Sequence, residues 1–162
     1  MQIINIDEQN FEQVAKIYEE GIKTGLATFQ NEVPDWQSWD KSHFSVCRIG
    51  VCEKKQMVGW SALSPVSSRC VYAGVAEVSV YVSALFRGKG IGKFLLNSLI
   101  TQSEKAGIWT LQSGIFEENI SSIVLHEKCG FRRIGFREKI GKIEGSWKNN
   151  VIMERRSKTI GV

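Results

Sequence analysis

The sequence predicts an α/β (α+β) fold in which a mixed central β-sheet is flanked by helices. Short stretches that alternate apolar and polar residues are interspersed with longer stretches whose apolar residues recur every three or four positions. These two periods are typical of strands and helices, respectively. The resulting order, βααβββαβαββ, combines strands joined by tight turns with strands joined through helices, which indicates a sheet with both hairpins and crossovers.

The composition of the 162-residue chain is that of a folded protein. Hydrophobic residues make up 43% and charged residues 23%, a balance typical of globular domains rather than disordered chains. No repeat or linker divides the sequence, so we expect a single domain over residues 1–162. The formal net charge of +4 suits an anionic ligand, whereas nucleic-acid binders usually concentrate basic residues on one face. We therefore expect no nucleic-acid partner.

The N-terminal part of the chain predicts a strand followed by two helices. Residues 2–6 alternate isoleucines with polar residues, as a half-buried strand does. Asp7 can cap a helix over about 8–24, whose apolar residues share one broad face, and Gly25 ends it. A Val-Pro pair then favours an extended backbone, and we expect a second helix around 35–45.

The middle of the chain predicts three strands. Two β-like runs, 46–53 and 57–64, flank a polar turn and indicate a hairpin. A serine-rich loop over 64–70 follows. Residues 75–82 form the clearest strand, because their valines alternate with other residues, among them Glu77. Glu77 and the valines are therefore expected on opposite faces of the sheet.

The last part of the chain alternates helices and strands. Apolar residues at helical spacing predict a helix over 91–106 that ends at Gly107. The remaining expected elements are, in order, a strand over 108–115, a helix from Asn119 to Cys129, a strand that opens at Gly130-Phe131, a final strand over 148–155, and a frayed tail over 156–162.

The four cysteines are scattered without a Cys-x-x-Cys pair or a nearby histidine cluster, so we expect no metal site. Cys47 and Cys52 fall in apolar runs, where small buried thiols are common. No basic leader with a long apolar core is visible, and no segment approaches the ~20 apolar residues of a membrane span. We expect a cytoplasmic protein with no membrane partner.

A glycine-rich loop joins the clearest strand to the helix that follows it. From Arg87 to Gly92 it reads Arg-Gly-Lys-Gly-Ile-Gly, and glycines let a backbone turn tightly and direct several N–H groups at one point. The helix N-terminus adds partial positive charge, and Arg87, Lys89 and Lys93 add full charges. The loop therefore predicts a pyrophosphate site.

Three phosphate-binding patterns compete for this loop. A dinucleotide fingerprint needs Gly-x-Gly-x-x-Gly, but the spacing here is Gly-x-Gly-x-Gly. A Walker loop needs Gly-x-x-x-x-Gly-Lys-Ser/Thr, but Phe94 follows Lys93 here. The third pattern, Arg/Gln-x-x-Gly-x-Gly/Ala, matches Arg87, Gly90 and Gly92. It resembles the pyrophosphate loop of the GCN5-related N-acetyltransferase (GNAT) family.

Two neighbouring segments resemble the same family. The run Val80-Tyr81-Val82 resembles the family strand whose exposed backbone pairs with the pantetheine arm of acetyl-CoA. Asn119 and His126 lie seven residues apart, hence on one helix face, and with Gly130-Phe131 they resemble the family's Asn, Tyr and Gly-Phe segment. The resemblance implies the GNAT fold, with a splayed cofactor cleft in its sheet, and acetyl-CoA as cosubstrate. The cofactor-binding residues that it implies are Val80, Tyr81, Val82, Arg87, Gly88, Lys89, Gly90, Ile91, Gly92, Lys93, Asn119 and Lys128.

Nearly the whole chain resembles the phosphinothricin and methionine sulfoximine/sulfone N-acetyltransferase subfamily. That resemblance implies acetylation of the α-amine of a small amino acid whose side chain carries a phosphinyl, sulfone or sulfoximine group. It also implies a homodimer. The matching pieces include Ala27-Thr28-Phe29, the run from Glu77 to Val82, Ile115-Phe116, the run from Leu125 to Lys128, Gly145-x-Trp147 and the run from Met153 to Arg156.

The subfamily resemblance also implies the roles of individual side chains. Phe29, Arg69 and Tyr72 fall where the subfamily binds its substrate, and a guanidinium can grip a carboxylate or phosphinate with two parallel bonds. Glu77 and His126 match positions that remove the amine proton. A carboxylate on an otherwise apolar strand is expected to have a raised pKa. Many family members have a tyrosine in place of His126, which leaves the identity of the general acid open.

Two other functions stay open from the sequence alone. A protein N-terminal acetyltransferase would share the cofactor loop but would favour an open or acidic groove for a peptide. A non-catalytic coenzyme A-sensing module would share the loop as well, and it would have no need for Glu77 and His126.

Overall fold

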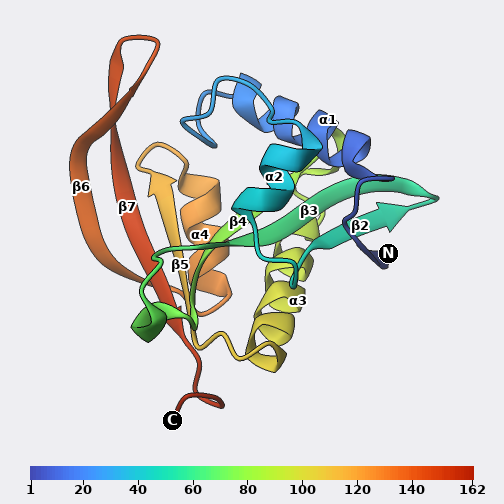
Figure 1. Cartoon of the computed structure of the whole chain (residues 1–162). Helices are drawn as coiled ribbons and strands as arrows, with labels where there is room; N and C mark the ends of the chain where they lie inside the picture. The colour runs from blue at the N-terminus through green and yellow to red at the C-terminus, as the bar shows by residue number, and fades with distance from the viewer.

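Seven strands form one mixed sheet in the computed structural model, which describes residues 1–162 (Figure 1). Their order across the sheet is β1-β2-β3-β4-β5-β7-β6. All neighbouring strands are antiparallel except β4 and β5, which run parallel. The strands are β1 Gln2–Asn5, β2 Ile49–Glu53, β3 Gln56–Pro65, β4 Val75–Val82, β5 Thr110–Phe116, β6 Arg132–Ile143 and β7 Ser146–Arg156.

Helices cover both faces of this sheet (Figure 1). On one face, Phe11 of α1 and Trp39 of α2 form an apolar cluster with Trp60 of β3. On the other face, Leu95 of α3 and Ile123 of α4 belong to a larger cluster. None of the helices combines the length and apolar character that a membrane span requires. The helices are α1 Phe11–Lys23, α2 Trp36–Ser42, α3 Ile91–Lys105 and α4 Ile120–Lys128, with short 3₁₀ turns at Cys70–Tyr72 and Ala84–Phe86.

The observed order of elements is the predicted one, βααβββαβαββ. Strand β4 has the predicted bounds, and the helices α1 and α3 end next to Gly25 and Gly107, whose φ angles of 67° and 80° end a helix readily. Asp35 caps α2 by accepting the N–H of Ser38 at 2.8 Å. The mixed α/β fold is thereby confirmed.

Several predicted boundaries were wrong for local reasons. Asp7 does not cap α1, because its carboxylate accepts the N–H groups of Gln9 and Asn10 and forms a turn before the helix. Helix α2 ends at Ser42 rather than near residue 45. Strand β2 starts at residue 49, because Cys47 adopts a φ of 60° that interrupts an extended backbone.

The C-terminal tail is held in place, although the sequence predicts that it frays. The guanidinium of Arg156 donates to the carbonyls of Ser157, Ile160 and Gly161 at 2.9, 3.0 and 2.5 Å. Ser157 is buried, and its hydroxyl donates to the carboxylate of Glu104 at 2.8 Å. These contacts fix the tail against the end of α3.

The parallel strands β4 and β5 separate after three residue pairs, the last of which is Glu77 with Gln112. Beyond this pair, β4 continues to pair only with β3, as far as Val82, and β5 continues to pair only with β7, as far as Phe116. The edges that the two strands turn toward each other therefore have no strand partner. This opening in the middle of the sheet is the splayed cleft that the family resemblance implies.

Candidate active site

A cleft of about 630 Å³ occupies the opening between β4 and β5. Residues of both strands line it, together with the segment 26–30, parts of α1 and α2, the first two turns of α4, and residues of β6 and β7. The predicted catalytic residues Glu77 and His126 both line this cleft. Among the other predicted site residues, Phe29, Val80, Tyr81 and Asn119 line it too.

Backbone groups of β4 point into the cleft. The N–H of Ser83 donates to the carbonyl of Val58 at 2.9 Å, and in an antiparallel pair the bonded positions alternate along the strand. Tyr81 therefore bonds to β3 through its backbone, whereas Val80 and Val82 turn their N–H groups toward the open edge. An amide-rich chain such as pantetheine can pair with this edge as an added strand would.

The glycine loop connects the C-terminal end of β4 to the first turn of α3. Gly88 and Gly90 have φ angles of 76° and 81°, and an added Cβ would meet no atom within 4 Å at either position. Glycine is therefore required there by the backbone angle rather than by packing. No side chain caps α3, so its first N–H groups are left for an anion. Arg87, which donates from Nε to the carbonyl of Val82 at 3.3 Å, and Lys89 are exposed beside them.

The remaining residues of the predicted cofactor set differ in their roles. A Cβ on Gly92 would come within 3.0 Å of Leu125, so this glycine lets α3 and α4 pack closely. Ile91 is fully buried in the core beneath the loop. Lys93 and Lys128 are exposed on α3 and α4. They add positive charge to this side of the molecule, which suits a polyanionic cosubstrate.

Glu77 lies at the point where β4 and β5 separate, with its side chain exposed to the cleft. No residue of the chain forms an ion pair or a hydrogen bond with its carboxylate. The apolar surroundings that the strand pattern predicts are absent, because the strand's valines point to the other face. An exposed, unpaired carboxylate can accept an ammonium ion or its proton directly.

His126 is buried on α4, where it lines the cleft. Its Nδ1 lies 2.7 Å from the carbonyl of Ser122, which can only accept, so Nδ1 carries the proton and Nε2 is a free acceptor. Nε2 has no partner within the chain. Burial lowers the pKa of His126 below its ordinary value of 6.5. The imidazole is therefore suited to accept a proton or hold a water rather than to act as an acid.

Asn119 joins α4 to the segment that follows α1. Its Oδ1 accepts the N–H of Ser122 at 3.3 Å and so caps α4, while its Nδ2 donates to the carbonyl of Leu26 at 3.1 Å. Phe29 lies three residues farther on and packs edge-to-face against Phe116 of β5 at 4.6 Å between ring centres. Asn119 thus positions one wall of the cleft.

Arg69 and Tyr72 lie outside this cleft, in the loop between β3 and β4. Both side chains are exposed, and the guanidinium carbon of Arg69 lies 5.5 Å from the centre of the Tyr72 ring. The structure brings these two residues together, as the prediction requires, but it does not bring them to the residues that line the cleft with Glu77. Their role in substrate binding stays a prediction.

Sequence reasoning missed several residues of the cleft. His43, the only other histidine, lines it, stacks on Trp39 at 4.2 Å and lies 2.7 Å through Nδ1 from the carbonyl of Trp39. Burial lowers the pKa of His43, so this imidazole also favours its neutral form. Tyr18 and Arg137 line the cleft as well. No local motif marks these positions, because distant elements bring them together.

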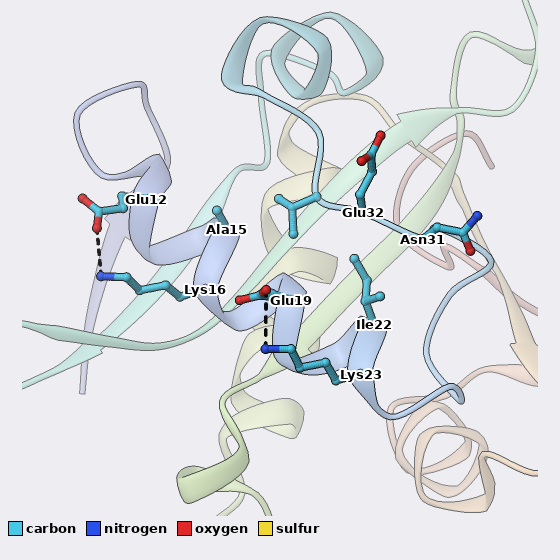
Figure 2. Close-up of a pocket in the computed structure, with 9 residues that line it drawn as sticks. Glu12, Ala15, Lys16, Glu19, Ile22, Lys23, Asn31 and Glu32 are labelled. Carbon is cyan, nitrogen blue, oxygen red and sulfur yellow. Dashed lines mark ion pairs between the residues drawn. The ribbon is translucent and has the colours of Figure 1, made fainter.

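A second, smaller pocket of about 390 Å³ lies between α1 and residues 31–33 (Figure 2). Two exposed ion pairs along α1 border it, Glu12 with Lys16 at 2.9 Å and Glu19 with Lys23 at 3.4 Å. Because these charges are already paired and solvated, they offer little to a ligand. None of the predicted site residues lines this pocket. No group of three or more His, Cys, Asp or Glu side chains anywhere in the chain could hold a metal ion.

The chain is similar in sequence to known acetyltransferases. The model of the Acetyltransferase (GNAT) family matches residues 11–131. The Phosphinothricin N-acetyltransferase of Alcaligenes faecalis is 28% identical over 157 residues, which cover 93% of this chain and 79% of that protein. The L-methionine sulfoximine/L-methionine sulfone acetyltransferase of Salmonella typhimurium is 28% identical over 136 residues, which cover 84% of this chain and 60% of that protein.

A solved structure has nearly the same fold along its whole length. The crystal structure of the Ribosomal-protein-alanine N-acetyltransferase from Brucella melitensis superposes with a TM-score of 0.89 at 25% sequence identity. The match covers 97% of this chain and 100% of that one. Proteins similar to this chain thus differ in the acceptors for which they are named.

Proposed function

The chain belongs to the GNAT family of acetyltransferases, which use acetyl-CoA, and we propose that it acetylates the α-amine of a small amino acid. Phosphinothricin and methionine sulfoximine or sulfone are the acceptors of this class that we propose. Two relatives of 28% identity carry the names of enzymes for these acceptors. Because identity at this level does not fix a substrate, the proposal depends on the residues of the cleft.

The observation that carries the proposal is the position of Glu77 at the end of the β4–β5 ladder. The open backbone edge starts beyond this residue, at Val80, so an acyl chain paired with the edge would end near the carboxylate. Glu77 has no partner of its own. It can therefore hold an ammonium group and accept its proton.

Different residues of the cleft would assist different steps of the acetyl transfer. Acetyl-CoA supplies an acetyl group as a thioester, and transfer forms a nitrogen–carbon bond and breaks the carbon–sulfur bond. The N–H group of Val80, the open position nearest to Glu77, lies where it can stabilise negative charge on the carbonyl oxygen. Glu77 takes the proton that the attacking ammonium loses, directly or through a water. His126 assists through Nε2, which is a free acceptor on the opposite side of the cleft.

The glycine loop fits the pyrophosphate of the cosubstrate. Two glycines with positive φ angles leave open space above the backbone, and the first turn of α3 has no side-chain cap. Arg87 and Lys89 supply positive charge at the same place. These features support acetyl-CoA binding in the predicted orientation, with its pyrophosphate at α3 and its acyl end at Glu77.

A protein N-terminal amine is the second candidate acceptor. The similarity to the Ribosomal-protein-alanine N-acetyltransferase supports it, and so does a cleft that is long enough to be lined by five strands and three helices. The cleft is not acidic, however, because Glu77 is its only carboxylate. This charge distribution favours a small zwitterion over a basic peptide.

We also propose that the protein forms a homodimer. Several large apolar side chains of β6 and β7 are exposed, although such side chains are usually buried. A second copy that packs against this hairpin would cover them. They are Ile134, Phe136, Ile140 and Trp147. Sedimentation of the purified protein over a range of concentrations tests this proposal, and a monomer at every concentration would overturn it.

A thiol-release assay tests the proposed reaction. Purified protein with saturating acetyl-CoA is given a panel of acceptors: phosphinothricin, methionine sulfoximine, methionine sulfone, unmodified amino acids, and a peptide with an N-terminal alanine. Release of coenzyme A with the small acidic or tetrahedral acceptors, and little with the peptide, supports the proposal. Preference for the peptide would favour the second candidate. Binding of acetyl-CoA without turnover of any amine would indicate a coenzyme A-sensing module.

A further inference from the structure

Two charged side chains that line the cleft have no partner within the chain. One is Glu77 of β4, and the other is Arg137 of β6. The other arginines at the start of β6 are paired, because Arg132 contacts Glu154 at 2.8 Å and Arg133 contacts Glu127 at 2.9 Å. The guanidinium of Arg137 is therefore left for a ligand or for solvent.

The strand register places both charged residues on one face of the sheet. Glu77 pairs with Gln112 of β5, and Phe116 lies four residues farther along the same strand, hence on the same face. Phe116 pairs with Asn150 of β7, which pairs in turn with Arg137. Residues that oppose each other in a ladder share a face. Arg137 and Glu77 thus border the cleft from the same side.

Their positions along the cleft are far apart. Four residues of β5 separate the level of Glu77 from that of Arg137, which corresponds to about 13 Å at ~3.3 Å per residue. Three strand spacings of about 5 Å each separate β4, which carries Glu77, from β6, since β5 and β7 lie between them. When the acceptor's amine is at Glu77, its α-carboxylate therefore stays near Glu77 as well, too far from Arg137 to contact it. Only a group several bonds from the amine can do so.

The far end of the cleft combines an apolar wall with two polar side chains that have unpaired polar atoms. The Oδ1 of Asn150, the residue opposite Arg137, is buried and has no hydrogen-bond partner. Phe29 packs against Phe116 and limits the cleft beside Asn150. The oxygens of a terminal group would bind the guanidinium, whereas the Oδ1 of Asn150, which only accepts, is left for a donor such as a water.

We propose that Arg137 is a specificity-determining residue that binds the acidic or tetrahedral end of the acceptor's side chain. This inference rests on the proposed function, since it takes the amine of a small amino acid to be at Glu77. Two parallel hydrogen bonds from a guanidinium suit a phosphinate or carboxylate and, without the charge attraction, a sulfone. Arg69 lies outside the cleft, on the loop that precedes the paired end of β4. If it contacts the substrate, it would contact the α-carboxylate instead.

The test compares acceptors that differ only at the far end of the side chain. Michaelis constants are measured with saturating acetyl-CoA for phosphinothricin and for methionine, in the wild type, Arg137→Gln and Arg137→Lys. We expect Arg137→Gln to raise the constant for phosphinothricin about 10- to 100-fold and that for methionine less than about 3-fold, with kcat nearly unchanged. Arg137→Lys should restore part of the preference, because it keeps the charge but loses the two parallel bonds.

Lys139→Gln is the matched control. It removes a positive charge from the same strand at an exposed residue that does not line the cleft, so the preference for phosphinothricin should stay at the wild-type level. An equal change for both acceptors in Arg137→Gln, or the same change in Lys139→Gln, would overturn the assignment of Arg137 while leaving the proposed function intact. A wild-type protein that neither acetylates nor, by calorimetry, binds any acidic acceptor would overturn both.

Discussion

Glu77 and Gln112 form the last residue pair between β4 and β5. The carboxylate of Glu77, which has no partner, thus lies at the point where the two strands separate. One residue thus marks the end of the parallel ladder, the beginning of the open backbone edge and the inner end of the cleft. A base at this position can meet an amine that arrives along the cleft and an acyl group held by the edge. The geometry of the strands, rather than an unusual environment of the carboxylate, makes Glu77 the leading candidate for the base.

Replacing Glu77 tests this role directly. Glu77→Gln keeps the size of the side chain but removes its basicity, and loss of a general base typically lowers a rate ~10²–10⁴-fold. We expect kcat for the preferred acceptor to fall by that factor while the affinity for acetyl-CoA stays within about twofold, since the backbone edge is unchanged. Ser79→Ala, on the same face of the same strand, is the control. A folded Glu77→Gln protein with the wild-type pH–rate profile would make His126 the leading candidate.

The glycine loop offers a closely matched pair of variants. Gly90 and Gly107 lie at the two ends of α3, with φ angles of 81° and 80°, and an added Cβ would meet no atom within 4 Å at either. Both Gly90→Asp and Gly107→Asp should lose about 1–2 kcal/mol of unfolding free energy through backbone strain. Only Gly90→Asp brings a carboxylate to the predicted pyrophosphate site. Calorimetric titration with acetyl-CoA should therefore show at least tenfold weaker binding for Gly90→Asp alone. Equal affinities of the two variants would contradict the assignment of the loop.

His126 predicts a dependence of stability on pH. Burial lowers its pKa in the folded chain below the ordinary value of 6.5, so between these two values the unfolded chain binds more protons than the folded one. The free energy of unfolding should consequently fall as the pH is lowered through 6.5, and the slope should lessen once the folded imidazole is protonated as well. His126→Asn, which can keep a donor to the Ser122 carbonyl, should flatten the curve. Urea denaturation between pH 5 and 7.5 measures it. An unchanged slope would mean that His43, whose pKa is lowered too, carries the effect.

The sequence predicts the elements well because their signals are local. Alternating valines define β4, and Gly25 and Gly107 end their helices because each adopts a positive φ angle. Asp7 shows where local rules fail, because an aspartate favours both a helix cap and a turn. Here it forms a turn with Gln9 and Asn10, and the helix begins after that turn. Helix α1 accordingly begins at Phe11, a member of the apolar cluster, rather than at residue 8.

The site is only partly predictable, because half of it comes from tertiary register. The glycine loop and Glu77 lie within motifs of consecutive residues, so the sequence identifies them. Arg137 and His43 enter the cleft from a distant hairpin and from the end of α2, and no spacing rule links them to Glu77. Arg69 is a case of the opposite kind. The family resemblance assigns it to the substrate, and it lies beside Tyr72 outside the cleft, so its role stays a prediction.

The side chain of Asn119 can have either of two roles, binding the cosubstrate or positioning one wall of the cleft. The family resemblance assigns it to the cofactor, whereas the structure shows it capping α4 and holding Leu26. Asn119→Asp keeps the oxygen that caps the helix but loses the donor to Leu26, and Asn119→Ala loses both. Loss of the cap should thus lower the free energy of unfolding by about 1 kcal/mol in the alanine variant, and the aspartate variant should lose little. Both variants free the segment that carries Phe29, so both should raise the Michaelis constant for the amine severalfold.

The Michaelis constant for acetyl-CoA decides between the two roles of Asn119. If it stays at the wild-type value in both variants, Asn119 acts by positioning the wall of the cleft. If it rises in Asn119→Asp, where the cap is intact, the side chain contacts the cosubstrate, because the new carboxylate would then repel it.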